Sequence, residues 1–162
     1  MRISIQLFLG LVLLVIGSSN SHAVEYADAD NLEEAYGFMY ARKVSAEMLR
    51  EKCSASFPEQ AQEIESNYQK WLSEDGELLR KVDASLAEIE KQEPGVIAKL
   101  DKLITEAITK GYADMEEAAK QNNDDSLSLF CSEQFSAMAD GSWRKRTPKA
   151  YEFINNAPLP KK

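Results

Sequence analysis

Histidine is almost absent from this chain of 162 residues, and turn-forming residues are scarce. The single histidine is His22, and the chain has seven glycines, five prolines and two cysteines. So few glycines and prolines argue against a turn-rich all-β protein and favour long helices. A composition that is 44% apolar and 28% charged is typical of one globular domain. It excludes collagen-like, low-complexity and polytopic membrane proteins.

Residues 1–23 have the layout of a secretory signal peptide. A short basic start at Arg2 is followed by an apolar stretch, 3–16, and by small polar residues up to Ala23. This stretch is shorter than the run of about 20 residues that a transmembrane helix needs, so we expect cleavage after Ala23 rather than a membrane anchor. The mature chain, 24–162, is then expected to be periplasmic or secreted and to keep no stable membrane span.

Loss of the signal peptide would remove His22 and leave a mature chain without histidine. This excludes Ser-His-Asp and Cys-His nucleophilic sites, histidine-based zinc sites and the Glu-x-x-His di-iron motif of helical bundles. The glycines are isolated, so the chain has no Gly-rich phosphate loop. We therefore expect no catalytic residue, no metal site and no cofactor. A pair of carboxylates could still cleave glycans, although most acidic residues fall at positions expected to face water.

The two cysteines, Cys53 and Cys131, are expected to form one disulfide. An even number of cysteines in an oxidising compartment favours pairing. Closing so long a loop would restrict the unfolded chain by about 4.5 kcal/mol in the loop-entropy model. Two separate buried thiols, which behave as small apolar side chains, are the alternative interpretation.

Apolar residues recur at helical spacing along most of the mature chain. Asp30 or Asn31 is expected to cap the first helix, and Asp75-Gly76 is expected to separate the second helix from the third. No segment has the sustained alternation of a strand. We therefore predict an all-α fold, a bundle of about five helices tied by one disulfide. The predicted helices are about 31–52, 58–72, 77–92, 96–121 and 127–138, with a further short helix at 148–155.

Basic residues concentrate at the C-terminal end of a chain whose net charge is −8. We divide the mature chain into a helical bundle domain, 24–140, and a basic C-terminal tail, 141–162. The tail either meets an anionic partner or folds back on the acidic bundle, and the second arrangement is favoured because intramolecular docking has a high effective concentration. A partner surface would use Trp143, Arg144 and Arg146, since exposed Trp and Arg are favoured interface anchors.

The pattern Cys53…Phe57-Pro58…Tyr68…Trp71, with the leader and the paired cysteines, resembles small secreted all-helical proteins of Gram-negative bacteria. Some proteins of this kind are periplasmic immunity proteins that block amidase toxins of the type VI secretion system. The resemblance implies a helical fold and binding to another protein. It implies no toxin-blocking residue at a particular position of this sequence.

These features predict a periplasmic or secreted, non-enzymatic binding protein: an inhibitor, an immunity protein or another protein-interaction module. The expected partner is another protein, and nucleic acid is not expected for a secreted chain with an acidic body. Two alternatives stay open at this point. One is a helical protein that binds a small ligand or supports the cell envelope, and the other is a carboxylate-dependent cell-wall hydrolase.

Overall fold

The computed structural model describes residues 28–158, and the predicted signal peptide lies outside them. The described part of the chain consists of six helices joined by short turns, without a strand. This confirms the predicted all-α bundle. In chain order the helices are α2 (Leu32–Ser56), α3 (Ala61–Gln92), α4 (Val96–Asn122), α5 (Ser126–Ala139), α6 (Ser142–Arg146) and α7 (Pro148–Asn156).

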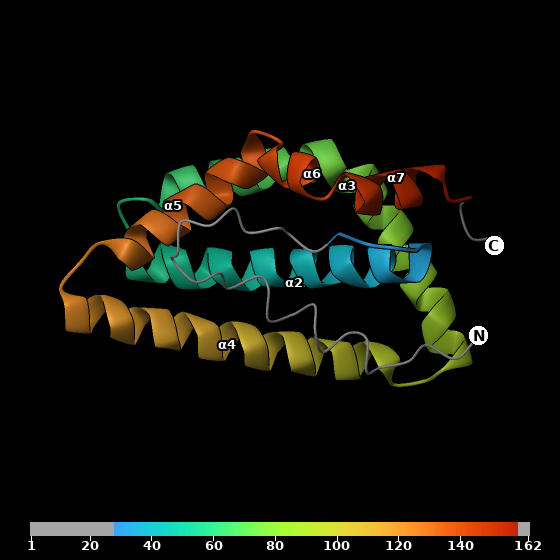
Figure 1. Ribbon diagram of the computed structural model, residues 1–162, viewed down its shortest axis with the longest axis horizontal. Coiled ribbons are helices and arrows are strands. Elements are labelled where there is room, and N and C mark those ends of the chain that lie inside the picture. The colour runs from blue at the N-terminus through green and yellow to red at the C-terminus, as the bar shows by residue number, and fades with distance from the viewer. Residues whose placement is uncertain (1–27, 159–162) are drawn as a thin grey trace.

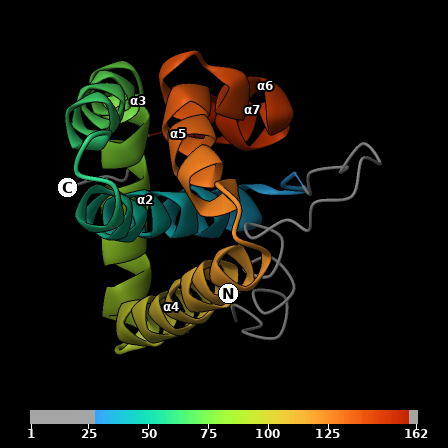
Figure 2. The same cartoon turned by 90° about the vertical axis from the view of Figure 1, so that its left-hand side faces the viewer.

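Helix α2 lies at the centre of the molecule and contacts α3, α4, α5 and α7. The two ribbon views show it between α4 on one side and α5, α6 and α7 on the other (Figures 1 and 2). Helices α2 and α4 run in the same direction, because the long α3 returns the chain to the end at which α2 begins (Figure 1). The largest fully buried side chains are Trp71, Phe135, Met39, Ile64, Ile108, Met138 and Ile154.

Short-range sequence signals explain the starts of two helices. The Asn31 Oδ1 accepts a hydrogen bond of 3.0 Å from the backbone N–H of Glu34, which confirms the cap predicted for α2. The Glu90 carboxylate of α3 accepts bonds of 2.6 and 2.9 Å from the backbone N–H groups of Gly95 and Ile97 at the start of α4. Both bonds lower the pKa of Glu90, and the bond from Ile97 has the larger effect. They also satisfy backbone donors at the N-terminus of α4.

The predicted break at Asp75-Gly76 is wrong, because α3 continues through both residues. An Asp-Gly pair is a common turn signal, but Asp75 is only 4% exposed and its carboxylate is bonded inside the fold. Glycine in a helix costs about 1 kcal/mol relative to alanine. Burial of Trp71 before it and Leu78 after it offsets that cost. Helix α3 changes direction part-way along (Figures 1 and 2), and Gly76 is its single glycine, a usual cause of such bends.

Cys53 of α2 and Cys131 of α5 form the predicted disulfide, with Cα atoms 5.8 Å apart. Both residues are fully buried. The bond ties the last turn of the central helix to a helix that also packs on α3. A cystine is compatible with an extracytoplasmic compartment. Among residues 28–158, none of the helices has both the length and the apolar character that crossing a bilayer requires.

The C-terminal segment folds back on the bundle, where α7 packs against α2 and α3. Residues from outside the segment satisfy both ends of α7. The Asp28 carboxylate accepts bonds of 2.8 and 2.9 Å from the backbone N–H groups of Lys149 and Ala150. At the other end, Lys81 Nζ donates to the carbonyl of Asn155 at 2.9 Å. The described part of the basic tail is therefore a component of the folded bundle.

Candidate functional site

The three residues predicted to bind a partner all lie in α6, where the structure gives them different environments. Trp143 is 8% exposed and packs edge-on against Trp71, with ring centroids 5.9 Å apart. This corrects the expectation that Trp143 is an exposed anchor. Arg144 is half exposed and forms an ion pair with the buried Asp75. Arg146 is exposed at the end of the helix.

Asp75 organises a buried polar group at the junction of α3, α6 and α7. Its Oδ2 accepts a bond of 2.8 Å from the Trp71 indole N–H and one of 2.6 Å from the Tyr151 hydroxyl, and its Oδ1 pairs with Arg144. Burial, with the bond to Asp75 in addition, raises the pKa of Tyr151 to about 12, so its hydroxyl is a donor at neutral pH. We call Trp71, Asp75, Trp143, Arg144 and Tyr151 the closed cluster.

Arg42 of α2 covers the closed cluster from the side of the central helix. Its guanidinium lies 4.5 Å from the ring centroid of Phe38 and 4.6 Å from that of Trp143. It also donates to the hydroxyl of the fully buried Thr147 at 3.0 Å, and that hydroxyl donates to the carbonyl of Trp143 at 3.0 Å. The polar groups of this junction are used to fasten α6 and α7 to the bundle.

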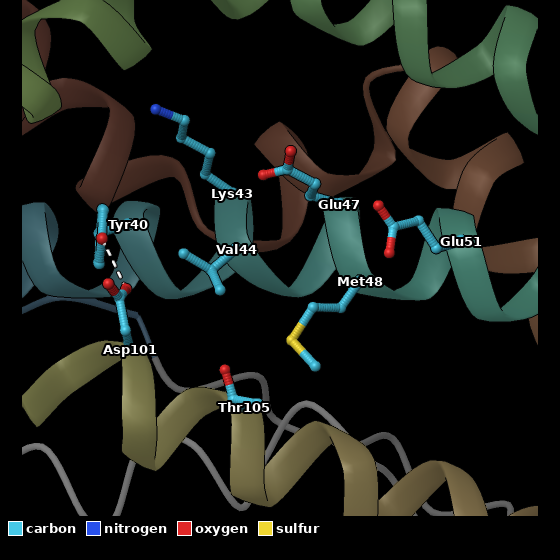
Figure 3. Close-up of a pocket in the computed structure, with 8 residues that line it drawn as sticks. All are labelled: Tyr40, Lys43, Val44, Glu47, Met48, Glu51, Asp101 and Thr105. Atoms are coloured by element: carbon cyan, nitrogen blue, oxygen red, sulfur yellow. Dashed lines mark hydrogen bonds between the residues drawn. The ribbon is translucent and has the colours of Figure 1, made fainter. Parts of the chain in front are cut away.

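A groove between α2 and α4 presents a different surface (Figure 3). Its volume is about 480 Å³. The side chains of Val44 and Met48 extend from α2 into the space toward α4 (Figure 3), and both are partly buried against the core. We call this feature the α2–α4 groove, defined by Tyr40, Lys43, Val44, Glu47, Met48, Glu51, Asp101 and Thr105.

One hydrogen bond joins the two walls of the α2–α4 groove at one end. The Tyr40 hydroxyl donates to Asp101 Oδ1 at 2.6 Å (Figure 3). Burial is the main cause that raises the pKa of Tyr40, and the bond to Asp101 adds to it. Tyr40 therefore stays protonated at neutral pH and holds the Asp101 carboxylate in position on the α4 wall.

Two carboxylates of the α2 wall lie outside the hydrogen-bond and ion-pair network of the described residues. Glu47 and Glu51 are exposed, one turn apart, and make no hydrogen bond or ion pair within residues 28–158. Lys43 lies one turn before Glu47, the usual spacing for an ion pair. Its Nζ instead lies 2.7 Å from both carboxylate oxygens of Asp83 on α3, and Figure 3 shows it turned away from Glu47.

Five acidic side chains elsewhere on the described helices pair with lysines three or four residues away. Such pairs are Lys70–Glu74, Glu88–Lys91, Lys102–Glu106, Lys110–Asp114 and Glu116–Lys120. The α2–α4 groove thus combines unpaired negative charge with an apolar floor. Because carboxylates attract cationic groups and the floor can cover an alkyl chain, the groove suits a side chain that has both parts.

The described residues offer no ready metal site, because no three His, Cys, Asp or Glu side chains within residues 28–158 are grouped to hold an ion. Comparisons with protein-family models, with curated proteins and with solved structures found no match to this chain.

The α2–α4 groove was not predicted from the sequence. The spacing of Lys43, Glu47 and Glu51 is visible there, but it favours a Lys43–Glu47 pair, which the tertiary contact with Asp83 replaces.

Proposed function

We propose that this protein is an extracytoplasmic, non-enzymatic binding protein whose partner is another protein. Within that class, an inhibitor or immunity-type role is the proposal that agrees with the resemblance of the stretch around Cys53. The observation that carries the proposal is the α2–α4 groove, where Glu47 and Glu51 stay unpaired beside the apolar floor of Val44 and Met48. The cystine and the predicted signal peptide support the location.

The surroundings of the groove carboxylates favour binding over catalysis. Catalytic carboxylates of glycan hydrolases act in pairs around an enclosed bond, and the general acid lies in an apolar site. Glu47 and Glu51 are exposed on one face of α2, and Asp101 is bonded to Tyr40 across the groove. The buried carboxylate, Asp75, is occupied by three partners in the closed cluster.

Partner capture from the native compartment tests the proposed function. The full chain, tagged at its C-terminus, is expressed in its source cells, and the extracytoplasmic fraction is cross-linked and analysed by mass spectrometry. We expect one dominant protein that, once purified, binds the purified chain saturably and reversibly. Recovery of self-contacts alone would overturn the proposal, and so would turnover of cell-wall glycans by the purified chain between about pH 4 and 8, where carboxylates act.

A further inference from the structure

We propose that the α2–α4 groove receives a segment of the protein partner that carries lysine or arginine side chains at alternate positions. This inference rests on the proposed function and adds the chemistry of the partner to it. Three carboxylates border the groove, Glu47 and Glu51 on the α2 wall and Asp101 on the α4 wall. Lys43 is the one cation among the eight groove residues, and it is engaged by Asp83 outside them.

The chemistry of the floor favours lysine and arginine over a small cation. Val44 and Met48 line the groove together with the three carboxylates and are partly buried against the core. A lysine or arginine can lay its alkyl stem on such a floor while its charged group reaches a carboxylate at the rim. A small inorganic cation would gain nothing from the apolar side chains.

The spacing of the carboxylates is close to that of alternate side chains in an extended segment. Side chains four residues apart on a helix have Cβ atoms about 5–6 Å apart, which describes Glu47 and Glu51. In an extended chain, side chains on the same face are two residues apart, about 6.6 Å along the strand. Two cationic side chains at alternate positions therefore match the two carboxylates without helical structure in the partner.

Two cations of α2 beside the groove carboxylates form ion pairs with α3. Lys43 pairs with Asp83, and Arg50, which also interacts electrostatically with Glu51, pairs with Glu65 at 2.9 Å. We therefore expect the positive charge that fills the groove to come from the partner. The chain's own Lys161 and Lys162 lie outside the described residues, and the experiment separates them from a partner.

A defined peptide tests the inference on the purified chain. The probe is a capped peptide of about eight residues with three arginines at alternate positions among serines, and its control has citrulline, an uncharged isostere, in their place. Calorimetric titration at about 50 and about 300 mM salt compares the wild type with E47Q/E51Q and with E59Q/E133Q. Glu59 and Glu133 are exposed and are not among the eight groove residues, so this control loses the same charge away from the groove lining.

We expect the arginine peptide to bind the wild type at least about tenfold more tightly than the citrulline peptide, and more weakly at the higher salt. E47Q/E51Q should weaken this binding about tenfold, as expected for two partly exposed charge pairs, and E59Q/E133Q should change it less than about twofold. Circular dichroism of each variant confirms that the helices are intact, so a loss of binding reports on the groove.

Several results would overturn the inference. They are equal binding of both peptides, an equal loss in both double variants, or displacement of the peptide by spermidine at equal charge concentration. Tighter peptide binding after deletion of residues 159–162 would identify the chain's own tail as the occupant. A captured partner whose affinity ignores E47Q/E51Q would overturn this inference while the proposed function stands. Absence of any protein partner would overturn the proposed function even if the peptide binds.

Discussion

The closed cluster and the α2–α4 groove use the same chemical groups in opposite ways. In the closed cluster, the Asp75 carboxylate has an indole, a phenol and a guanidinium as partners, and it is 4% exposed. In the groove, the carboxylates of Glu47 and Glu51 are exposed and have no hydrogen-bond or ion-pair partner within residues 28–158. The bonded carboxylate of Asp75 stabilises the fold, whereas the carboxylates of Glu47 and Glu51 can still accept hydrogen bonds from another molecule.

Two of the tail residues predicted to bind a partner are used within the fold instead. Aromatic and arginine side chains mark interfaces when they are exposed, but Trp143 and Arg144 complete the chain's own core junction. Acidic residues on helix faces, by contrast, are usually solvated, so their presence in a sequence does not indicate where a partner binds. Exposed glutamates without an ion pair also occur elsewhere among the described residues, as at Glu59 and Glu133, so the groove is distinguished by the position of Glu47 and Glu51 beside the apolar Val44 and Met48.

The largest expected effect concerns the disulfide, which fastens α2 to the α5 side of the molecule that leads into the closed cluster. The bond spans 78 residues, and in the loop-entropy model its loss from C53S/C131S should lower the free energy of unfolding by about 4.5 kcal/mol. Urea unfolding monitored by circular dichroism measures this change. The wild-type protein, measured in the presence of a reductant, should have a free energy of unfolding close to that of the variant. A loss below about 1 kcal/mol would mean that packing alone holds α5 in place.

Removal of the Asp75 side chain should have the next largest effect. D75A leaves the Trp71 N–H, the Tyr151 hydroxyl and the Arg144 guanidinium without their acceptor, and we expect a loss of about 3 kcal/mol in urea unfolding. The matched variant R144A removes only the half-exposed partner and should cost about 1 kcal/mol. Equal losses in the two variants would contradict the view that Asp75 is the organising residue of the closed cluster.

Most of the helical segments could be predicted from the sequence, because the signals for them are local. The Asn31 cap, the apolar stripes and the pairing of Cys53 with Cys131 were all predicted and are confirmed. The continuation of α3 through Gly76 was missed, because tertiary burial of Asp75 overrides a local turn signal. The α2–α4 groove was missed for a similar reason.

The groove depends on two contacts between residues that are distant in the sequence. Lys43 could have paired with Glu47, and only the position of α3 shows that it pairs with Asp83. The Tyr40–Asp101 bond joins residues 61 positions apart. Contacts of this kind depend on how helices pack, which the apolar pattern of each helix leaves open.

A substitution of Gly76, next to the closed cluster, is expected to increase the free energy of unfolding by a smaller amount. G76A should raise the free energy of unfolding by about 0.5–1 kcal/mol, because alanine favours the helix and an added Cβ would meet no atom within 4 Å. The affinity of the α2–α4 groove for the arginine peptide should not change. Urea unfolding of G76A measures the change in the free energy of unfolding. A lower free energy of unfolding in the variant would mean that the bend of α3 requires glycine.

The unfolding free energy of E47Q/E51Q tests most directly the central claim, that the stability of the fold does not require the groove carboxylates. Neutralising two like charges one turn apart should leave this energy unchanged or raise it by about 0.3 kcal/mol. D75A, measured in the same buffer, should show its large loss. A loss of about 1 kcal/mol or more in E47Q/E51Q would contradict the claim, because it would show that the groove carboxylates stabilise the chain itself.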